Sequence, residues 1–152
     1  MKHESFAYTR GMDEQEITDL LAETRTGVLA LADGNEAYAI PIAHAIVSDE
    51  LILRLGITET SEKRRFLDTT RTACYVVYDT QETGSPTELE SRSVLLTGTL
   101  ERVTDTDYDA ASINRRFPPI RVFSEDIESV EIEMYRFAVE TRLGRITPDF
   151  PE

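Results

Sequence analysis

The chain has 152 residues, 40% of them apolar and 8% aromatic, which is enough to bury one hydrophobic core. Its 29 acidic and 16 basic residues give a formal net charge of −13, which disfavours contact with the phosphate backbone of nucleic acids. No apolar run approaches the roughly 18 residues of a membrane-spanning helix, so the composition predicts a single soluble domain over residues 1–152, with neither nucleic-acid nor membrane partners.

Two details of the composition concern the environment of the protein. The first residues contain no apolar segment typical of a secretory signal, and the single Cys74 cannot form an internal disulfide, so we expect a cytoplasmic location. Only Lys2 and Lys63 are lysines, and acidic residues are spread along the whole chain. This pattern resembles halophilic proteins, whose surface charges repel less when salt screens them, and it predicts a loss of folding or dimerisation at low salt.

The first regular element is predicted to be a short amphipathic helix over residues 12–26. Asp13 and Glu16 have the spacing of a capping box, and three apolar residues share one face of the helix. Gly27 marks the end of the helix.

Six strands are predicted in the rest of the chain. They cover residues 27–32, 36–47, 51–56, 72–79, 91–103 and 129–143. Short polar turns join the first three strands into a meander, and Gly98 marks a bulge or a close backbone approach. Further short helices are expected to begin near Thr60 or Ser61 and to cover residues 105–117. Because no βαβ rhythm is present, the fold class is mainly β, and a closed or partly closed six-stranded antiparallel barrel is the simplest way to remove the strand edges.

The last strand has an ambiguous pattern. Its apolar residues first occupy even positions, such as Ile132 and Met134, and then odd positions, such as Phe137 and Val139. The slip falls at residues 135–136. Side chains alternate between the two faces of a sheet, so the slip interrupts the strand pattern at these two residues.

Few residues in the sequence are typical of a catalytic or metal site. Cys74 lies in an apolar strand, which is typical of a buried structural cysteine. His44 is a lone histidine in a strand, more typical of a satisfied or exposed side chain than of a ligand or a base. The chain has no spaced set of cysteines and histidines, so no metal site is expected.

Residues 58–64 carry the features of a site for a phosphate monoester. Hydroxyl side chains precede the predicted helix, whose first N–H groups have no partner within the helix, and Lys63 with Arg64 adds positive charge at the same end. The alternative is a capped surface helix whose charged side chains form solvated ion pairs.

A proline interrupts the second predicted strand. Pro41 has no N–H group, so it requires a bulge or an open edge at its place in strand 36–47. The backbone groups of Ile40, Ile42 and Ala43 would then be available to a planar heteroaromatic ligand, for which the small Ala43 leaves room. A simple edge-strand proline is the alternative.

The order of these motifs resembles a known family. The segment "YAIPIAHAIVSDELILRLGITETSEKRRFLDTTRTACYVVYDT", followed by "SVLLTGTLERV", is similar to the pyridoxamine 5′-phosphate oxidase-like split β-barrels that bind flavin, and most closely to their short haloarchaeal members. The resemblance spans roughly residues 12–104, and "SEK", "VVYD" and "SV" are its sharper parts. It implies a homodimer with two FMN sites at the subunit interface, each built from both chains.

The resemblance also implies roles for individual residues. It places the isoalloxazine ring of FMN against four residues of one strand, namely Ile40, Pro41, Ile42 and Ala43. Arg54 and Leu55 would lie along the ribityl chain, Ser61 and Lys63 would bind the phosphate, and Ser93 would lie at the dimer face near the flavin.

One position departs from the family pattern. Many relatives have an arginine before the lysine, whereas this chain has Glu62. The phosphate would therefore rely on Arg64 or on an arginine of the partner chain.

The implied activity is that of an FMN-dependent oxidoreductase acting on a small molecule, with a nicotinamide nucleotide as a possible reductant. Pyridoxamine phosphate itself is not the expected substrate, because its oxidases carry a C-terminal tryptophan and this chain has none. Three alternatives remain open: a deazaflavin-dependent reductase, a non-catalytic flavin-binding or sensing module, and a haem-handling relative with His44 as ligand.

Overall fold

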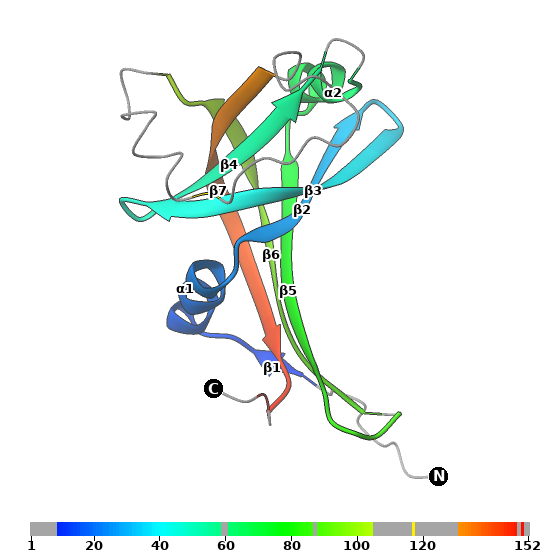
Figure 1. The fold of residues 1–152 in the computed structure, drawn as a ribbon, viewed down its shortest axis with the longest axis vertical. Coiled ribbons are helices and arrows are strands. Elements are labelled where there is room, and N and C mark those ends of the chain that lie inside the picture. Colours follow the sequence, from blue (N-terminus) through cyan, green and yellow to red (C-terminus); the bar gives the residue numbers. More distant parts are fainter. Residues whose placement is uncertain are drawn as a thin grey trace.

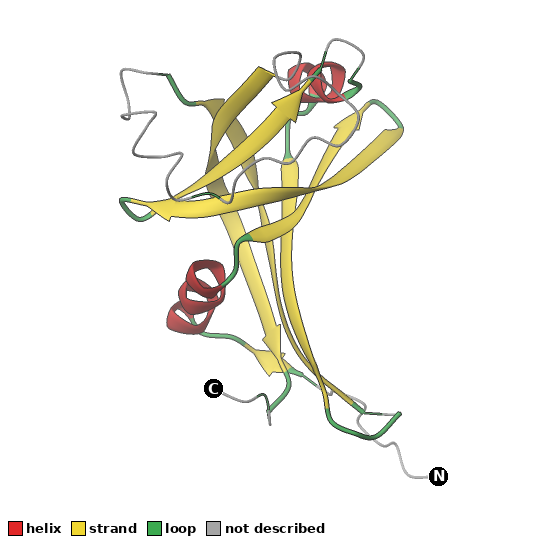
Figure 2. Ribbon diagram, in the orientation of Figure 1, coloured by secondary structure: helices red, strands yellow, loops and turns green. Residues whose placement is uncertain are grey.

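The computed structural model describes residues 9–58, 61–86, 88–104, 117, 131–148 and 150, and antiparallel strands dominate them (Figures 1 and 2). The elements are β1 (Arg10–Gly11), α1 (Glu14–Glu23), β2 (Thr26–Asp33), β3 (Glu36–Val47), β4 (Glu50–Ile57), α2 (Lys63–Thr69), β5 (Ala73–Glu82), β6 (Leu89–Arg102) and β7 (Glu131–Ile146). The mainly β prediction is confirmed. The six predicted strands correspond to β2–β7, and β1 adds a two-residue strand.

The sheet order is β1-β7-β4-β3-β2-β5-β6, and a further pairing of β7 with β6 closes the sheet into a barrel. The closure is incomplete in places, because β3 pairs with β4 only from Ala43 to Val47, and β2 pairs with β5 only from Val28 to Ala30. The long strands β5, β6 and β7 run the length of the molecule, while α1 and α2 lie near opposite ends of the barrel (Figure 1).

Local sequence signals account for several of these elements. The backbone N–H of Glu16 donates to the Asp13 carboxylate at 2.8 Å, and Asp13 N–H donates to the Glu16 carboxylate at 3.1 Å, which confirms the capping box of α1. The predicted bulge is also present, because the β6–β7 register shifts between Thr97 and Gly98. A Cβ at Gly98 would collide with the backbone of Ala138, so only glycine fits.

Of the two other predicted helices, the structure describes one. The structure begins α2 at Lys63, two to three residues later than expected. Glu62 is the N-cap residue and already has helical backbone angles, and the Ser61 hydroxyl accepts from Lys63 N–H at 3.2 Å. The predicted helix over residues 105–117 lies outside the described residues apart from Phe117.

The barrel interior is mainly apolar. Side chains such as Leu53, Val77 and Leu96 are fully buried in one core cluster. From Glu133 to Val139 of β7 the odd-numbered side chains face inward, so Glu133 is buried while Ile132 is 42% exposed. The ambiguity of the last strand is thus resolved in favour of a charged residue inside the barrel.

His44 and Tyr75 form a buried polar pair beneath α1. The Nε2 of His44 lies 3.0 Å from the carbonyl oxygen of Leu21, which can only accept, so this nitrogen carries the proton. Nδ1 therefore accepts from the Tyr75 hydroxyl at 2.6 Å. Burial lowers the pKa of His44, consistent with a neutral ring. With both ring nitrogens bonded, His44 secures the end of α1 rather than presenting a ligand atom.

Replacing Tyr75 with phenylalanine is expected to lower the free energy of unfolding by about 1–3 kcal/mol, because Nδ1 of His44 would be buried without a donor. Urea denaturation at neutral pH measures the change. Tyr38→Phe is the matched control, since it keeps the ring that stacks on Phe66 at 4.8 Å. Equal losses in the two variants would contradict the assigned hydrogen bond.

Candidate functional site

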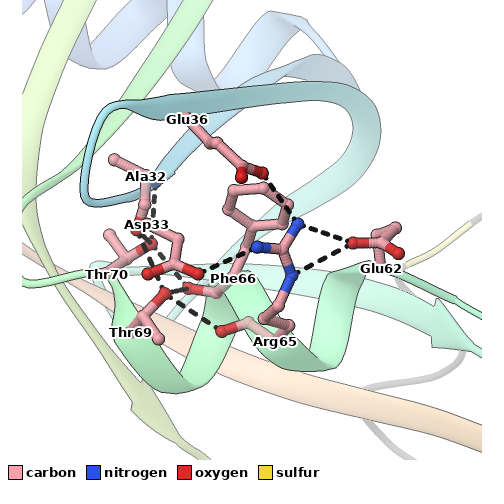
Figure 3. A network of polar contacts seen from close by, with 8 residues as sticks. All are labelled: Ala32, Asp33, Glu36, Glu62, Arg65, Phe66, Thr69 and Thr70. Atoms are coloured by element: carbon pink, nitrogen blue, oxygen red, sulfur yellow. Dashed lines mark hydrogen bonds and ion pairs between the residues drawn. The ribbon is translucent and has the colours of Figure 1, made fainter.

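The helix α2 is fixed to the β2–β3 hairpin by a charged network (Figure 3). The guanidinium of Arg65 forms ion pairs with Asp33 at 2.9 Å, with Glu36 at 3.0 Å and with Glu62 at 2.8 Å. The hydroxyl of Thr70 adds a hydrogen bond to the carbonyl of Ala32 at 3.1 Å. Exposed ion pairs contribute little individually, but together they set the position of the helix on the hairpin.

An aromatic contact holds the same side of α2. Phe66 is the buried residue of this helix, and its ring stacks on Tyr38 of β3 at 4.8 Å. The guanidinium of Arg65 covers the Phe66 ring at 4.4 Å. Burial of the Phe66 ring therefore provides most of the packing that keeps this two-turn helix in place.

The opposite side of α2 contacts β7. Both terminal nitrogens of Arg64 donate to the carboxylate of Glu133, whose side chain is fully buried. Tyr135 donates to the same carboxylate at 3.1 Å, and Arg102 of β6 lies 3.2 Å from it. Burial alone would raise the pKa of Glu133, but the hydrogen bonds from Arg64 and Tyr135 and the two nearby arginines lower it overall.

Lys63 is the first residue of α2, and its side chain reaches back to β4. Its Nζ donates to the carbonyl oxygen of Gly56 at 2.6 Å, and its backbone N–H donates to the Ser61 hydroxyl. The structure therefore brings Ser61 and Lys63 together with the end of β4, directly after Leu55.

Pro41 lies where β3 has no β4 neighbour in register. It is opposite Val28 of β2, whereas the pairing with β4 starts only at Ala43, so the predicted open edge is present. The N–H of His44 donates to the carbonyl of Arg25 on the β2 side. Because backbone groups alternate along an antiparallel strand, the N–H groups of Ile40 and Ile42 also point toward β2. The expectation that the backbone groups of these two residues are available to a ligand is therefore wrong.

The four predicted ring contacts divide between the two faces of β3. Ile40 and Ile42 pack into the core, whereas Pro41 and Ala43 have the opposite side-chain direction. Arg54 lies opposite Ala43 on β4 and therefore lies on the same side of the sheet as Pro41 and Ala43. Its guanidinium lies 4.8 Å from the centre of the Phe117 ring. Leu55 points inward and is buried, so only its backbone can reach the side of the sheet where Arg54 lies.

Ser93 lies far from this group within one chain. It is opposite Arg145 of β7, whereas Arg54 is opposite Met134 of the same strand. Eleven residues of extended strand correspond to about 35 Å. The structure thus brings the residues of β3, β4 and the start of α2 into one neighbourhood and leaves Ser93 apart from them.

Ser93 borders an exposed apolar surface, which we call the outer face and which comprises Val76, Tyr78, Leu95 and Leu143. Leu95 is opposite both Val76 and Leu143 in register, and Tyr78 is opposite Ser93. The exposed fractions of Tyr78, Leu95 and Leu143 are 64%, 38% and 59%. Adjacent exposed apolar side chains of this size are typical of a contact surface with another protein chain.

A cavity of about 500 Å³ lies elsewhere, between α1, the β3–β4 turn and β7. Leu21, Ile46, Leu51 and Phe137 contribute to its apolar lining, and none of the predicted site residues lines it. In the described part of the chain, no cluster of His, Cys, Asp and Glu residues could hold a metal ion. Neither of the described helices, α1 and α2, has the length and apolar composition of a membrane span.

Neither the role of Glu133 nor the Tyr75–His44 pair is predicted by the sequence. Glu133 could have been noticed from the odd positions of Tyr135 and Phe137, which place it on the same strand face. Its partners Arg64 and Arg102 are distant in sequence, and no local pattern indicates such contacts.

Comparisons with known proteins agree with this fold. An FAD-binding protein from Mesorhizobium loti has 17% identity and a TM-score of 0.62, covering 90% of this chain and 95% of its own. An FAD-binding protein from Mycobacterium smegmatis has 16% identity and a TM-score of 0.64, covering 91% of this chain and 98% of its own. An FAD- and heme-binding protein from the same organism has 20% identity and a TM-score of 0.66, with coverages of 95% and 76%.

No curated protein matches the chain. A family model described as pyridoxamine 5′-phosphate oxidase matches residues 13–146, which is most of the chain and includes all seven strands except β1. The chain therefore belongs to the pyridoxamine 5′-phosphate oxidase family and has its split β-barrel fold.

Proposed function

We propose that this protein is a homodimeric flavoprotein that binds FMN between its protomers and acts as an oxidoreductase on a small molecule. The observation that carries the proposal is the position of Lys63, which the start of α2 holds beside the end of β4 and near the open edge of β3. An ammonium group, a neighbouring hydroxyl and the outward Arg54 form a donor set that suits a phosphate monoester with an attached polar chain.

The residues divide into subsites in this proposal. Ser61 and Lys63 hold the phosphate, and Arg64, next along α2, supports them. Arg54 and the backbone of Leu55 lie along the ribityl chain. The ring lies on the outer side of β3, against Pro41 and Ala43, while Ile40 and Ile42 hold that strand to the core.

A second protomer completes the site in this proposal. Ser93 lies about 35 Å along β7 from the position of Arg54, which is longer than an FMN molecule. Ser93 can therefore contribute only from the partner chain, and the outer face beside it supplies an apolar surface for that contact.

Flavin, when bound, supplies the hydride-transfer chemistry. The residues of this chain bind it, orient it and exclude water from one face of the ring. The positive charge of Arg54 favours a reduced, anionic flavin wherever its guanidinium approaches the ring. A nicotinamide nucleotide is the proposed electron donor, and the acceptor is a small oxidised molecule.

The visible spectrum of the purified protein, with identification of the released small molecule, tests this proposal. Release of FMN with reduction by NADH or NADPH is the expected result. FMN that these donors do not reduce would favour a non-catalytic binding or sensing module. Release of a deazaflavin would favour a deazaflavin-dependent reductase. Release of FAD would mean that Ser61 and Lys63 bind a pyrophosphate group and not a phosphate monoester.

The acidic surface supports a further part of the proposal, namely a cytoplasm rich in salt. We expect the unfolding temperature to be clearly higher in about 1 M than in about 0.1 M KCl, because the screening length falls about threefold and the −13 net charge repels itself less. Thermal denaturation at the two concentrations measures this. Equal unfolding temperatures would contradict the halophilic interpretation.

A further inference from the structure

Glu133 is a charged residue inside an otherwise apolar barrel end. Its side chain is fully buried, and it lies on β7 opposite Leu55 of β4. A buried carboxylate persists only when donors surround it. Here the donors come from three elements: Arg64 on α2, Arg102 on β6 and Tyr135 on β7.

The contact with Arg64 is bidentate. One terminal nitrogen donates to Oε1 at 3.1 Å and the other donates to Oε2. A paired arrangement of this kind fixes the orientation of the guanidinium as well as its distance. Both terminal nitrogens of Arg64 are thus directed at Glu133, away from any role as a free phosphate donor.

The two ends of α2 are held by different parts of the fold. Thr70, just after the helix, bonds to Ala32 in the β2–β3 hairpin, while the first turn is held to β7 through Arg64. The first turn is also held to the hairpin through Arg65. Loss of the Glu133 contact would therefore remove its attachment to β7 and let Ser61 and Lys63 shift, while the hairpin contacts keep the helix in place.

We propose that Glu133 is a positioning residue for the phosphate subsite: through Arg64 it sets where α2 begins and hence where Ser61 and Lys63 lie. The inference rests on the proposed flavin function. It assigns Arg64 a role that acts through Glu133 and not by direct contact with the phosphate.

The test compares FMN with riboflavin, which lacks the phosphate, by flavin-fluorescence titration of the flavin-free protein. Glu133→Gln is expected to weaken FMN binding about 10-fold or more, the loss that follows when a charged hydrogen bond is misaligned, while riboflavin binding stays within about twofold. Glu131→Gln is the matched control, because Glu131 is exposed and lies 3.8 Å from the same arginine. It is expected to change neither affinity.

A double-mutant cycle separates the two roles of Arg64. If Arg64 acts through Glu133, Arg64→Met and Glu133→Gln should each lower FMN affinity by the same factor, and the double variant should lose no more. Additive losses would show that Arg64 contacts the phosphate directly and would overturn the inference. Arg64→Lys keeps the charge but not the paired hydrogen bonds to Glu133, so it should also lose the preference for FMN over riboflavin.

Further outcomes are decisive. Parallel losses for FMN and riboflavin in Glu133→Gln would indicate a general structural role and overturn the inference, as would unchanged FMN affinity. If Glu133→Gln does not fold, Arg64→Lys provides the test, because Arg64 is 41% exposed and its replacement should be tolerated. Full FMN affinity of the Arg64→Lys variant would overturn the inference. A wild-type protein without preference for FMN over riboflavin would instead overturn the proposed function, and this inference with it.

Discussion

Replacing Lys63 with alanine is expected to weaken FMN binding by about 10- to 100-fold, because a charge-assisted hydrogen bond to a phosphate contributes about 1.5–3 kcal/mol. Riboflavin binding should be unchanged, since riboflavin has no phosphate. The fold should persist, because α2 is held by Phe66 and Arg65 on the hairpin side. Titration of flavin-free protein measures the affinities, and thermal denaturation reports on the fold.

Arg71→Ala is the matched control for this change. Arg71 is exposed and follows α2 at its other end, so its removal takes one positive charge from the same region without altering the proposed phosphate subsite. A general electrostatic effect would weaken FMN binding in both variants. If Lys63→Ala binds FMN as tightly as the wild type, the phosphate lies elsewhere and the assigned pocket is wrong.

Signals that act within a few residues predicted most of the fold. The capping box at Asp13 and Glu16 depends on a four-residue geometry, and it placed α1 correctly. The bulge at Gly98 follows from the absence of a side chain at a crowded backbone contact. The open edge at Pro41 follows from a missing N–H group. In each case the residue itself carries the physical cause, so the sequence suffices.

Contacts between distant segments decided what the sequence left open. On β7, the even-numbered and the odd-numbered apolar residues were equally consistent with an inward-facing strand side. Glu133 can face inward because Arg64 and Arg102 lie within reach of its carboxylate. Neither partner is near Glu133 in sequence. The candidate site behaves in the same way: the sequence marked Lys63 and Pro41 separately, whereas their common neighbourhood comes from the pairing of β3 with β4.

Leu143→Glu is expected to dissociate the proposed dimer and, with it, to remove most FMN binding. Leu143 is 59% exposed on the outer face, directly opposite Leu95. A carboxylate introduced at an apolar contact loses water without gaining a partner, which should raise the dimer dissociation constant by at least about 100-fold. Analytical ultracentrifugation measures the oligomeric state, and flavin titration of the same samples measures FMN affinity.

The joint result distinguishes a shared site from a contained one. Because Ser93 and Arg54 lie about 35 Å apart along β7, a monomer would retain only one half of the proposed site, so the two measurements should fall together. Gln15→Glu adds the same charge on an exposed position of α1 and is expected to leave both unchanged. A monomeric Leu143→Glu protein that still binds FMN at full affinity would show that one chain forms the whole site, and the role of Ser93 across the interface would then be wrong.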